Sequence, residues 1–206
     1  GVMTDDSANV SCPVSTMDTA RGTFAMDVNG DGWLDLMQST DGASSTYLGN
    51  GDLTWSSSST FKSPLVLWSS TATTSDQGIR TADINGDGRV DLLQRSTFAT
   101  STIYFNTASG WSLYTGSDWS IPEEFVDQYG QDRNVRIFDL NGDGLPDIIR
   151  KYTDSSPHTS VYLNTGSGWS LDSNWDIPVN NLKDGVIFAD INNDGLMDLL
   201  QSYRTG

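Results

Sequence analysis

The stretch DLNGDGLPD, residues 139–147, places four acidic or amide side chains and two glycines in nine positions. Three further copies occur: DVNGDGWLD at 27–35, DINGDGRVD at 83–91 and DINNDGLMD at 190–198. The copies begin 56, 56 and 51 residues apart, as residues 27, 83, 139 and 190 show. Such a period indicates a repeat protein built from copies of one small supersecondary unit.

The segments around the third copy predict β-strands at 135–139, 147–153, 159–164 and 169–178, because apolar and polar residues alternate there. Turns are expected at 154–157 and 165–168. Four short strands in about 50 residues, joined by Gly, Asn and Pro turns, are typical of one β-propeller blade. No segment shows a sustained helical period, so we expect an all-β fold with few helices.

We expect a single repeat array over residues 1–206, with blades at 20–75, 76–130, 131–182 and 183–206. The fourth blade is incomplete, because only LLQSYRTG follows its acidic stretch. Residues 1–19 are expected to add one strand, around VSCPV at 10–14. About three and a half blades leave an unpaired β edge, which proteins normally cover. Either more of the chain or another subunit is expected to pair there.

The composition favours cation binding and argues against nucleic acid. The chain has 27 acidic and 11 basic residues, a net charge of −16, and no basic patch to neutralise phosphates. Nearly all the acid is Asp, which suits metal loops on turns. Cys12 is alone, so no internal disulfide is expected, and no run of apolar residues is long enough for a transmembrane helix. The abundance of Ser, Thr, Asn and Gly with little Lys is typical of an extracellular, secreted protein.

Oxygen-bearing residues at alternate positions of a short loop suit Ca²⁺, which takes about six to eight oxygen ligands. Positions 1, 3, 5 and 9 are Asp, Asn, Asp and Asp in every copy, and position 7 is expected to bind through its backbone carbonyl. Gly at position 6, and Gly or Asn at position 4, allow a positive φ. The expected ligands of about four ions are Asp27, Asn29, Asp31, Trp33, Asp35, Asp83, Asn85, Asp87, Arg89, Asp91, Asp139, Asn141, Asp143, Leu145, Asp147, Asp190, Asn192, Asp194, Leu196 and Asp198.

Two alternatives to this loop type are an EF-hand and a simple Asx turn. An EF-hand needs a Glu at position 12 and flanking helices. Position 12 is Gln in the first, second and fourth copies and Arg150 in the third copy, and the flanking segments have the pattern of strands. Asx-Gly turns are common in hairpins, but four copies in phase with a structural repeat favour a metal loop.

The D-x-N-x-D-G-x-x-D loop between two apolar strands resembles the FG-GAP or VCBS repeat of integrin-α-type β-propellers. YLNTGSGW, residues 162–169, is similar to propeller repeats of large bacterial secreted proteins, including the B components of insecticidal toxin complexes and Rhs-like toxins. The resemblance covers residues 20–206 and implies calcium ligands at the Asp, Asn, Asp and Asp positions. The chain departs from the family in having about three and a half blades and no clear FG-GAP dipeptide.

Aromatic residues recur at matching places in the repeats and are expected to pack between blades. They are Tyr47, Tyr104, Tyr162, Trp111, Trp169, Trp119 and Trp175. A second interpretation gives one or two exposed Trp a sugar-stacking role. A glycan pocket would then lie beside Trp111 or Trp169, with Asn106 or Asn164 nearby.

Catalytic residues are scarce. His158 is the single histidine and is expected in a solvated turn, so a Ser-His-Asp relay has one poor candidate base. Glu123 and Glu124 are adjacent in a linker and cannot flank one glycosidic bond. We therefore expect no enzyme, but a calcium-stabilised extracellular module that acts as a structural, assembly or protein-binding scaffold. The alternative is a glycan-binding lectin or adhesin.

Overall fold

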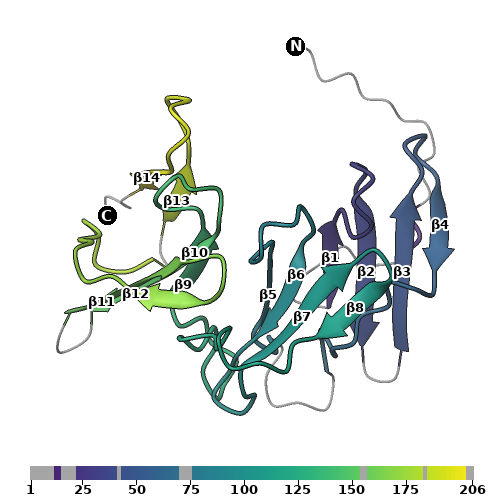
Figure 1. Ribbon diagram of the computed structural model, residues 1–206, viewed down its shortest axis with the longest axis horizontal. Coiled ribbons are helices and arrows are strands. Elements are labelled where there is room, and N and C mark those ends of the chain that lie inside the picture. The colour runs from purple at the N-terminus through teal and green to yellow at the C-terminus, as the bar shows by residue number, and fades with distance from the viewer. Residues whose placement is uncertain are drawn as a thin grey trace.

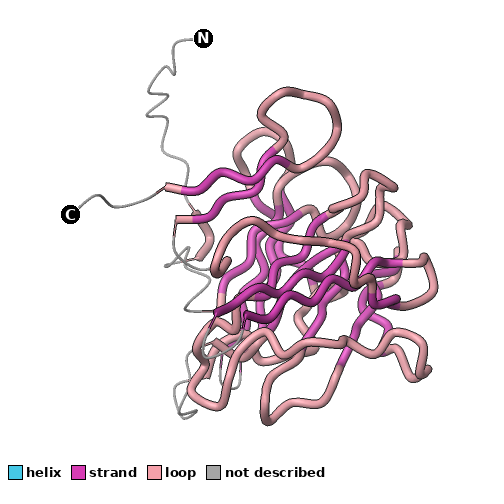
Figure 2. Tube along the Cα trace, turned by 90° about the vertical axis from the view of Figure 1, so that its left-hand side faces the viewer, coloured by secondary structure: helices cyan, strands magenta, loops and turns pink. Residues whose placement is uncertain are grey.

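The computed structural model describes residues 12–14, 22–40, 43–69, 76–153, 157–182 and 185–202. These residues form strands and loops only, as the tube in Figure 2 shows. The all-β prediction is therefore confirmed. Residues 154–156 of the expected turn at 154–157, and residues 10 and 11 of the expected strand at 10–14, lie outside the described residues, whereas Pro157 begins a strand. Residues 12–14 are described and are not in a strand.

The first two sheets are four-stranded antiparallel meanders in which the strands follow chain order. The repeated stretch joins the first strand of each sheet to the second, so one acidic loop stands at the same place in each. The first sheet consists of β1 (Thr23–Met26), β2 (Asp35–Thr40), β3 (Ala43–Gly49) and β4 (Trp55–Ser58). The second consists of β5 (Ile79–Ala82), β6 (Asp91–Gln94), β7 (Thr102–Thr107) and β8 (Gly110–Leu113).

The third sheet repeats this meander, and a two-stranded sheet follows it. Figure 1 shows the first two sheets side by side and the third grouped with the two-stranded one. The third consists of β9 (Val135–Phe138), β10 (Asp147–Thr153), β11 (Pro157–Asn164) and β12 (Trp169–Leu171). The last sheet pairs β13 (Val186–Ala189) with β14 (Asp198–Gln201) and matches the first half of a blade, as expected for an unfinished fourth repeat.

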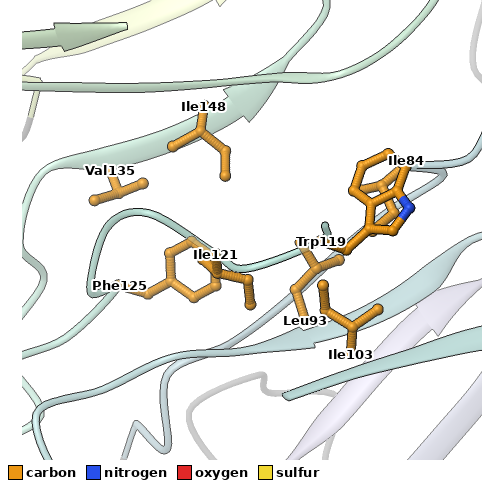
Figure 3. Packing of buried hydrophobic residues seen from close by; sticks show 8 residues of the cluster. All are labelled: Ile84, Leu93, Ile103, Trp119, Ile121, Phe125, Val135 and Ile148. Atoms are coloured by element: carbon orange, nitrogen blue, oxygen red, sulfur yellow. The ribbon is translucent and has the colours of Figure 1, made fainter. Parts of the chain in front are cut away.

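Layers of buried apolar side chains separate neighbouring sheets. Side chains of a strand alternate between its two faces, and the second strand of each blade uses both. Leu92 joins the layer shared with the first sheet, whereas Leu93 joins the layer shared with the third. Figure 3 shows the middle layer, where Ile148 of the third sheet lies opposite Leu93 and Ile103 of the second. The core is therefore a series of thin layers between blades.

The segments that cross from one blade to the next supply the largest side chains of these layers. Trp119 and Phe125 follow β8 and are buried between the second and third sheets. The Trp119 ring lies edge-on to Trp169, with centroids 5.5 Å apart. The interpretation of the recurring tryptophans as packing residues is thereby confirmed for these two.

Candidate metal-binding loops

The acidic loops at 27–35, 83–91, 139–147 and 190–198 each close a hairpin between the first two strands of a sheet. In the first loop, Met26 is the strand partner of Asp35, so position 9 already belongs to the second strand. The equivalent pairs are Ala82 with Asp91 and Phe138 with Asp147. Loop positions 1 to 8 therefore form the bend, and position 9 anchors it to the sheet.

Asp at position 1 organises the bend by accepting backbone N–H groups. In the third loop, Asp139 Oδ1 accepts from Gly142 at 2.7 Å, and Oδ2 accepts from Gly144 at 2.8 Å. The same residue accepts from Asp143 at 3.2 Å. Both glycines have a positive φ, of 80° and 88°, which glycine adopts without steric cost. In the fourth loop Asn193 takes the first of these positions with φ 61°, as its expected tolerance of a left-handed turn predicted.

Positions 3 and 5 lie at the exposed tip next to position 1. Asn141 Oδ1 accepts the Asp143 N–H at 2.9 Å, and the Asn141 amide donates to Asp143 Oδ2 at 2.9 Å. The other three loops repeat this pair of contacts. The structure thus brings the predicted ligands at positions 1, 3 and 5 together at the tip of every loop.

Position 9 lies beneath the loop, where it is buried in the first three loops and half-buried in the fourth. Asp91 is fully buried, and its two oxygens accept backbone N–H groups of Ile84 and Asn106 at 3.1 and 2.8 Å. Burial raises the pKa of the Asp91 carboxyl to about 7, despite these two donors, which lower it. Burial also raises the pKa of Asp35 and of Asp147 above the ordinary value. The charge of this carboxylate is therefore only partly compensated within the protein.

The chemistry of the loop fits a hard cation. Within the described ranges, no three acidic, histidine or cysteine side chains converge closely enough to form a ready-made metal centre. Every side-chain atom predicted to bind the ion is nevertheless an oxygen. A carboxylate oxygen that accepts one N–H keeps a further lone pair with which it can bind a metal ion. Oxygen donors on a loop of this kind suit Ca²⁺. Positions 1, 3 and 5 would hold the ion at the tip, and position 9 from beneath.

Position 7 has a role in blade contacts that the sequence analysis did not anticipate. Leu145 of the third loop lies against Gly86 of the second, where an added Cβ would stand 2.9 Å from its Cδ2. Leu196 has the same relation to Gly142, at 2.7 Å. Arg89 lies over Gly30 and donates to the Asn29 carbonyl at 2.7 Å. The position-7 side chains of the second, third and fourth loops therefore each pack on the glycine at position 4 of the preceding loop.

Asn106 and Asn164, expected beside a glycan pocket, are buried and bind the backbone instead. Asn106 Nδ2 donates to the Val28 carbonyl at 2.7 Å, and Asn164 Nδ2 donates to the Ile84 carbonyl at 2.8 Å. Each of these bridging asparagines thus reaches from the third strand of one blade into the loop of the preceding blade. At the pocket expected beside Trp111 or Trp169, the Trp111 indole N–H donates to the Phe61 carbonyl and its ring packs in a layer between blades. The Trp169 indole nitrogen is buried and has no hydrogen-bond partner among the described residues.

A different surface pocket, of about 230 Å³, lies beside the first loop. Trp33 is 52% exposed at its rim, and the half-buried Trp55 also lines it. The indole N–H of Trp55 has no hydrogen-bond partner among the described residues. Leu53, with φ 66°, completes an apolar rim.

The other singled-out residues lie apart from the loops. His158 was expected in a turn but lies in β11, where its ring stacks on Tyr152 at 4.7 Å. Glu123 pairs with Arg150 at 2.9 Å, and Glu124 pairs with Arg133 at 3.5 Å. Cys12 is exposed and free. No helix able to cross a membrane occurs in the described part of the chain.

Comparisons with known proteins agree with this architecture. A family model described as an FG-GAP-like repeat matches residues 27–94 and 139–200. No curated protein sequence matches significantly. A solved lectin of Agrocybe aegerita, which recognises non-reducing terminal N-acetylglucosamine, has a TM-score of 0.55 at 17% identity over 86% of this chain and 45% of its own. The Tc holotoxin pore of Photorhabdus luminescens aligns at a TM-score of 0.42 and 17% identity, over 92% of this chain and 11% of its own. The chain spans less than half the length of either structure.

Proposed function

The chain belongs to the FG-GAP-like repeat family, and from that premise we propose that it is a calcium-stabilised, non-enzymatic scaffold that works outside the cell. One observation carries the proposal: in four acidic loops at the same place in successive sheets, Oδ2 of the position-1 Asp accepts the N–H of the position-6 Gly. Ca²⁺ would offset the charge of the position-9 carboxylate, which is buried in the first three loops. Four ions would change the net charge from −16 to −8, since each adds two positive charges.

A calcium titration tests this proposal directly. We expect isothermal titration to count about four Ca²⁺ per chain, with dissociation constants of about 10⁻⁴ to 10⁻³ M, the range of extracellular modules. Asp31→Ala removes an exposed ligand at the tip of the first loop and should reduce the count by one. No detectable binding, or an unchanged count in the variant, contradicts the proposal.

The non-enzymatic part of the proposal is supported by the contacts of the acidic and basic candidates. A general acid or base needs to reach substrate in a suitable protonation state. Glu123 is instead held by Arg150, and the His158 ring is stacked on Tyr152. The carboxylates of the loops have roles as ligands or as acceptors of backbone N–H groups.

We place the assembly surface of the scaffold on the two-stranded sheet β13–β14. Leu200 is 40% exposed, whereas Ile149, which holds the same place in the third blade, is 1% exposed. Ile187, the strand partner of Leu200, is also exposed, so this face is apolar. An exposed apolar face on the end sheet of an array is suited to association. We propose that the same face of a second copy of the chain covers it, because an apolar surface without charges can pair with itself across a two-fold axis.

Light scattering in calcium tests this surface. We expect a dimer at high concentration, and Leu200→Lys should yield a monomer because it places a charge in the apolar contact. Leu171→Lys is the matched control, since Leu171 is exposed on β12, away from this face. A monomeric protein at all concentrations, or equal behaviour of the two variants, contradicts the proposed dimer.

Glycan binding is the second candidate function, and the pocket beside the first loop favours it. The exposed face of Trp33 can stack on a sugar ring, and Leu53 and Trp55 add apolar surface to the same pocket. N-acetylglucosamine is the first probe, because the solved lectin of the same fold recognises it. A saturable change in tryptophan fluorescence that Trp33→Ala abolishes supports this candidate. No response to N-acetylglucosamine, or the same response in the variant, rejects that sugar at this pocket.

A further inference from the structure

The buried aspartates at position 9 of the first two loops are joined by hydrogen bonds across a blade boundary. Asp91 accepts the backbone N–H of Asn106, and the side chain of Asn106 donates to the carbonyl of Val28. The N–H of Val28 in turn donates to Asp35 at 2.8 Å. Asp35, Val28, Asn106 and Asp91 are all buried, so no solvent interrupts this series.

The same series crosses the next blade boundary. Asp147 accepts the backbone N–H of Asn164 at 2.8 Å, and the Asn164 side chain donates to the Ile84 carbonyl. The Ile84 N–H donates to Asp91, which already belongs to the first series. A continuous buried path therefore runs from Asp147 through Asp91 to Asp35, and it passes through one bridging asparagine at each boundary.

From this path we infer that Asn106 and Asn164 are positioning residues that couple neighbouring loops, so that an ion bound in one loop raises the calcium affinity of the next. The inference rests on the proposed calcium function. An ion in the second loop would fix Asp91 and thereby the backbone of Asn106. The Asn106 side chain then holds the position-2 carbonyl of the first loop, which reduces the freedom that this loop must lose when it binds its own ion.

Two further features agree with this role. The position-7 side chains give neighbouring loops a second contact, since Leu145 lies on Gly86 of the loop before it. The first blade has Gly49 where Asn106 and Asn164 stand in the next two blades, and the Gly49 N–H likewise donates to Asp35. Glycine has no side chain with which to bridge to another loop.

Coupling can be detected at a loop that cannot itself bind an ion. In an Asp31→Ala protein, we measure amide hydrogen exchange of Val28 by NMR while calcium fills the remaining loops. We expect calcium to slow this exchange by about 5-fold to 150-fold, the usual range of coupling between two sites. Adding Asn106→Ala should abolish the effect, because the contact with the Val28 carbonyl is lost. Asn106→Gly, which copies the residue of the first blade, is a second variant should the alanine protein fold poorly.

Thr46→Val is the matched control, because it removes a buried hydrogen bond, from Thr46 Oγ1 to the Phe61 carbonyl at 2.8 Å, within the first blade. It should leave the calcium effect on Val28 intact. If ions bind elsewhere and Val28 exchange is unchanged by calcium, or changes equally with and without Asn106, the coupling is overturned and the calcium function stands. If titration of the wild-type protein shows no calcium binding, both are overturned.

Discussion

We expect removal of calcium by a chelator to lower the melting temperature of the protein by about 20–40 °C. A ligand that binds only the folded state stabilises it by about 2.7 kcal/mol per site at 100-fold excess over the dissociation constant. Four filled loops would together contribute roughly 11 kcal/mol on that basis. This is comparable to the whole stability of a typical domain. A chain of this size shifts its melting temperature by about 2–4 °C per kcal/mol.

The structural reason for so large an effect is the charge in each loop. Three aspartates stand within nine residues, and one of them is buried in every complete blade. Without an ion these carboxylates repel each other, and the hairpin that anchors the blade is weakened. Calorimetry in about 10 mM calcium and in excess chelator measures the difference, at a concentration about 100-fold above the tighter expected dissociation constant. Magnesium at equal concentration is the control for ionic strength. Coincident melting curves in calcium and chelator would falsify the calcium role.

The fold could be predicted because each blade is specified locally. Alternating apolar and polar residues, as in Val135–Phe138 and Asp147–Thr153, indicate strands. Glycines at fixed loop positions indicate the bend between these strands. The unfinished fourth repeat was also visible from the sequence alone. Local patterns of this kind do not depend on how the blades pack against each other.

The contacts between blades could not be predicted, because they join residues that are far apart in sequence. Asn106 is 78 residues from Val28, and Asn164 is 80 residues from Ile84. The sequence shows both asparagines after a tyrosine-containing strand, but an Asn in that place is equally compatible with a surface site. They are buried only because the loop of the preceding blade packs against them. The contact of Leu145 with Gly86 likewise depends on how neighbouring blades pack against each other.

The role of position 9 was predicted only in part. Asp91 stands at the start of an apolar strand, which indicates a buried residue. The sequence was interpreted only as a calcium ligand at this position, so the burial was not predicted. The structure shows that Asp91 also binds two backbone N–H groups, from Ile84 and Asn106. It therefore has a structural role that does not depend on a metal ion, and substitution can separate that role from calcium binding.

Asp91→Ala is accordingly expected to lower the free energy of unfolding by about 3–5 kcal/mol even in the presence of chelator. The substitution leaves the N–H groups of Ile84 and Asn106 buried without an acceptor, at about 1–3 kcal/mol each. It also leaves space in a fully buried site. The loss occurs in the folded protein whether or not an ion is bound. In calcium, the weakened second loop adds to it.

Asp87→Ala, at position 5 of the same loop, is the matched control because its side chain is exposed. In chelator it should change the free energy of unfolding by no more than about 0.5 kcal/mol, as is usual for surface positions. In calcium it should lose the stabilisation that comes from the second loop. Urea unfolding of the wild type and of both variants, each with and without calcium, gives the six free energies of unfolding that are needed. If the two variants lose the same free energy in chelator, position 9 has no structural role of its own, and the buried path through Asp91 does not support the blades.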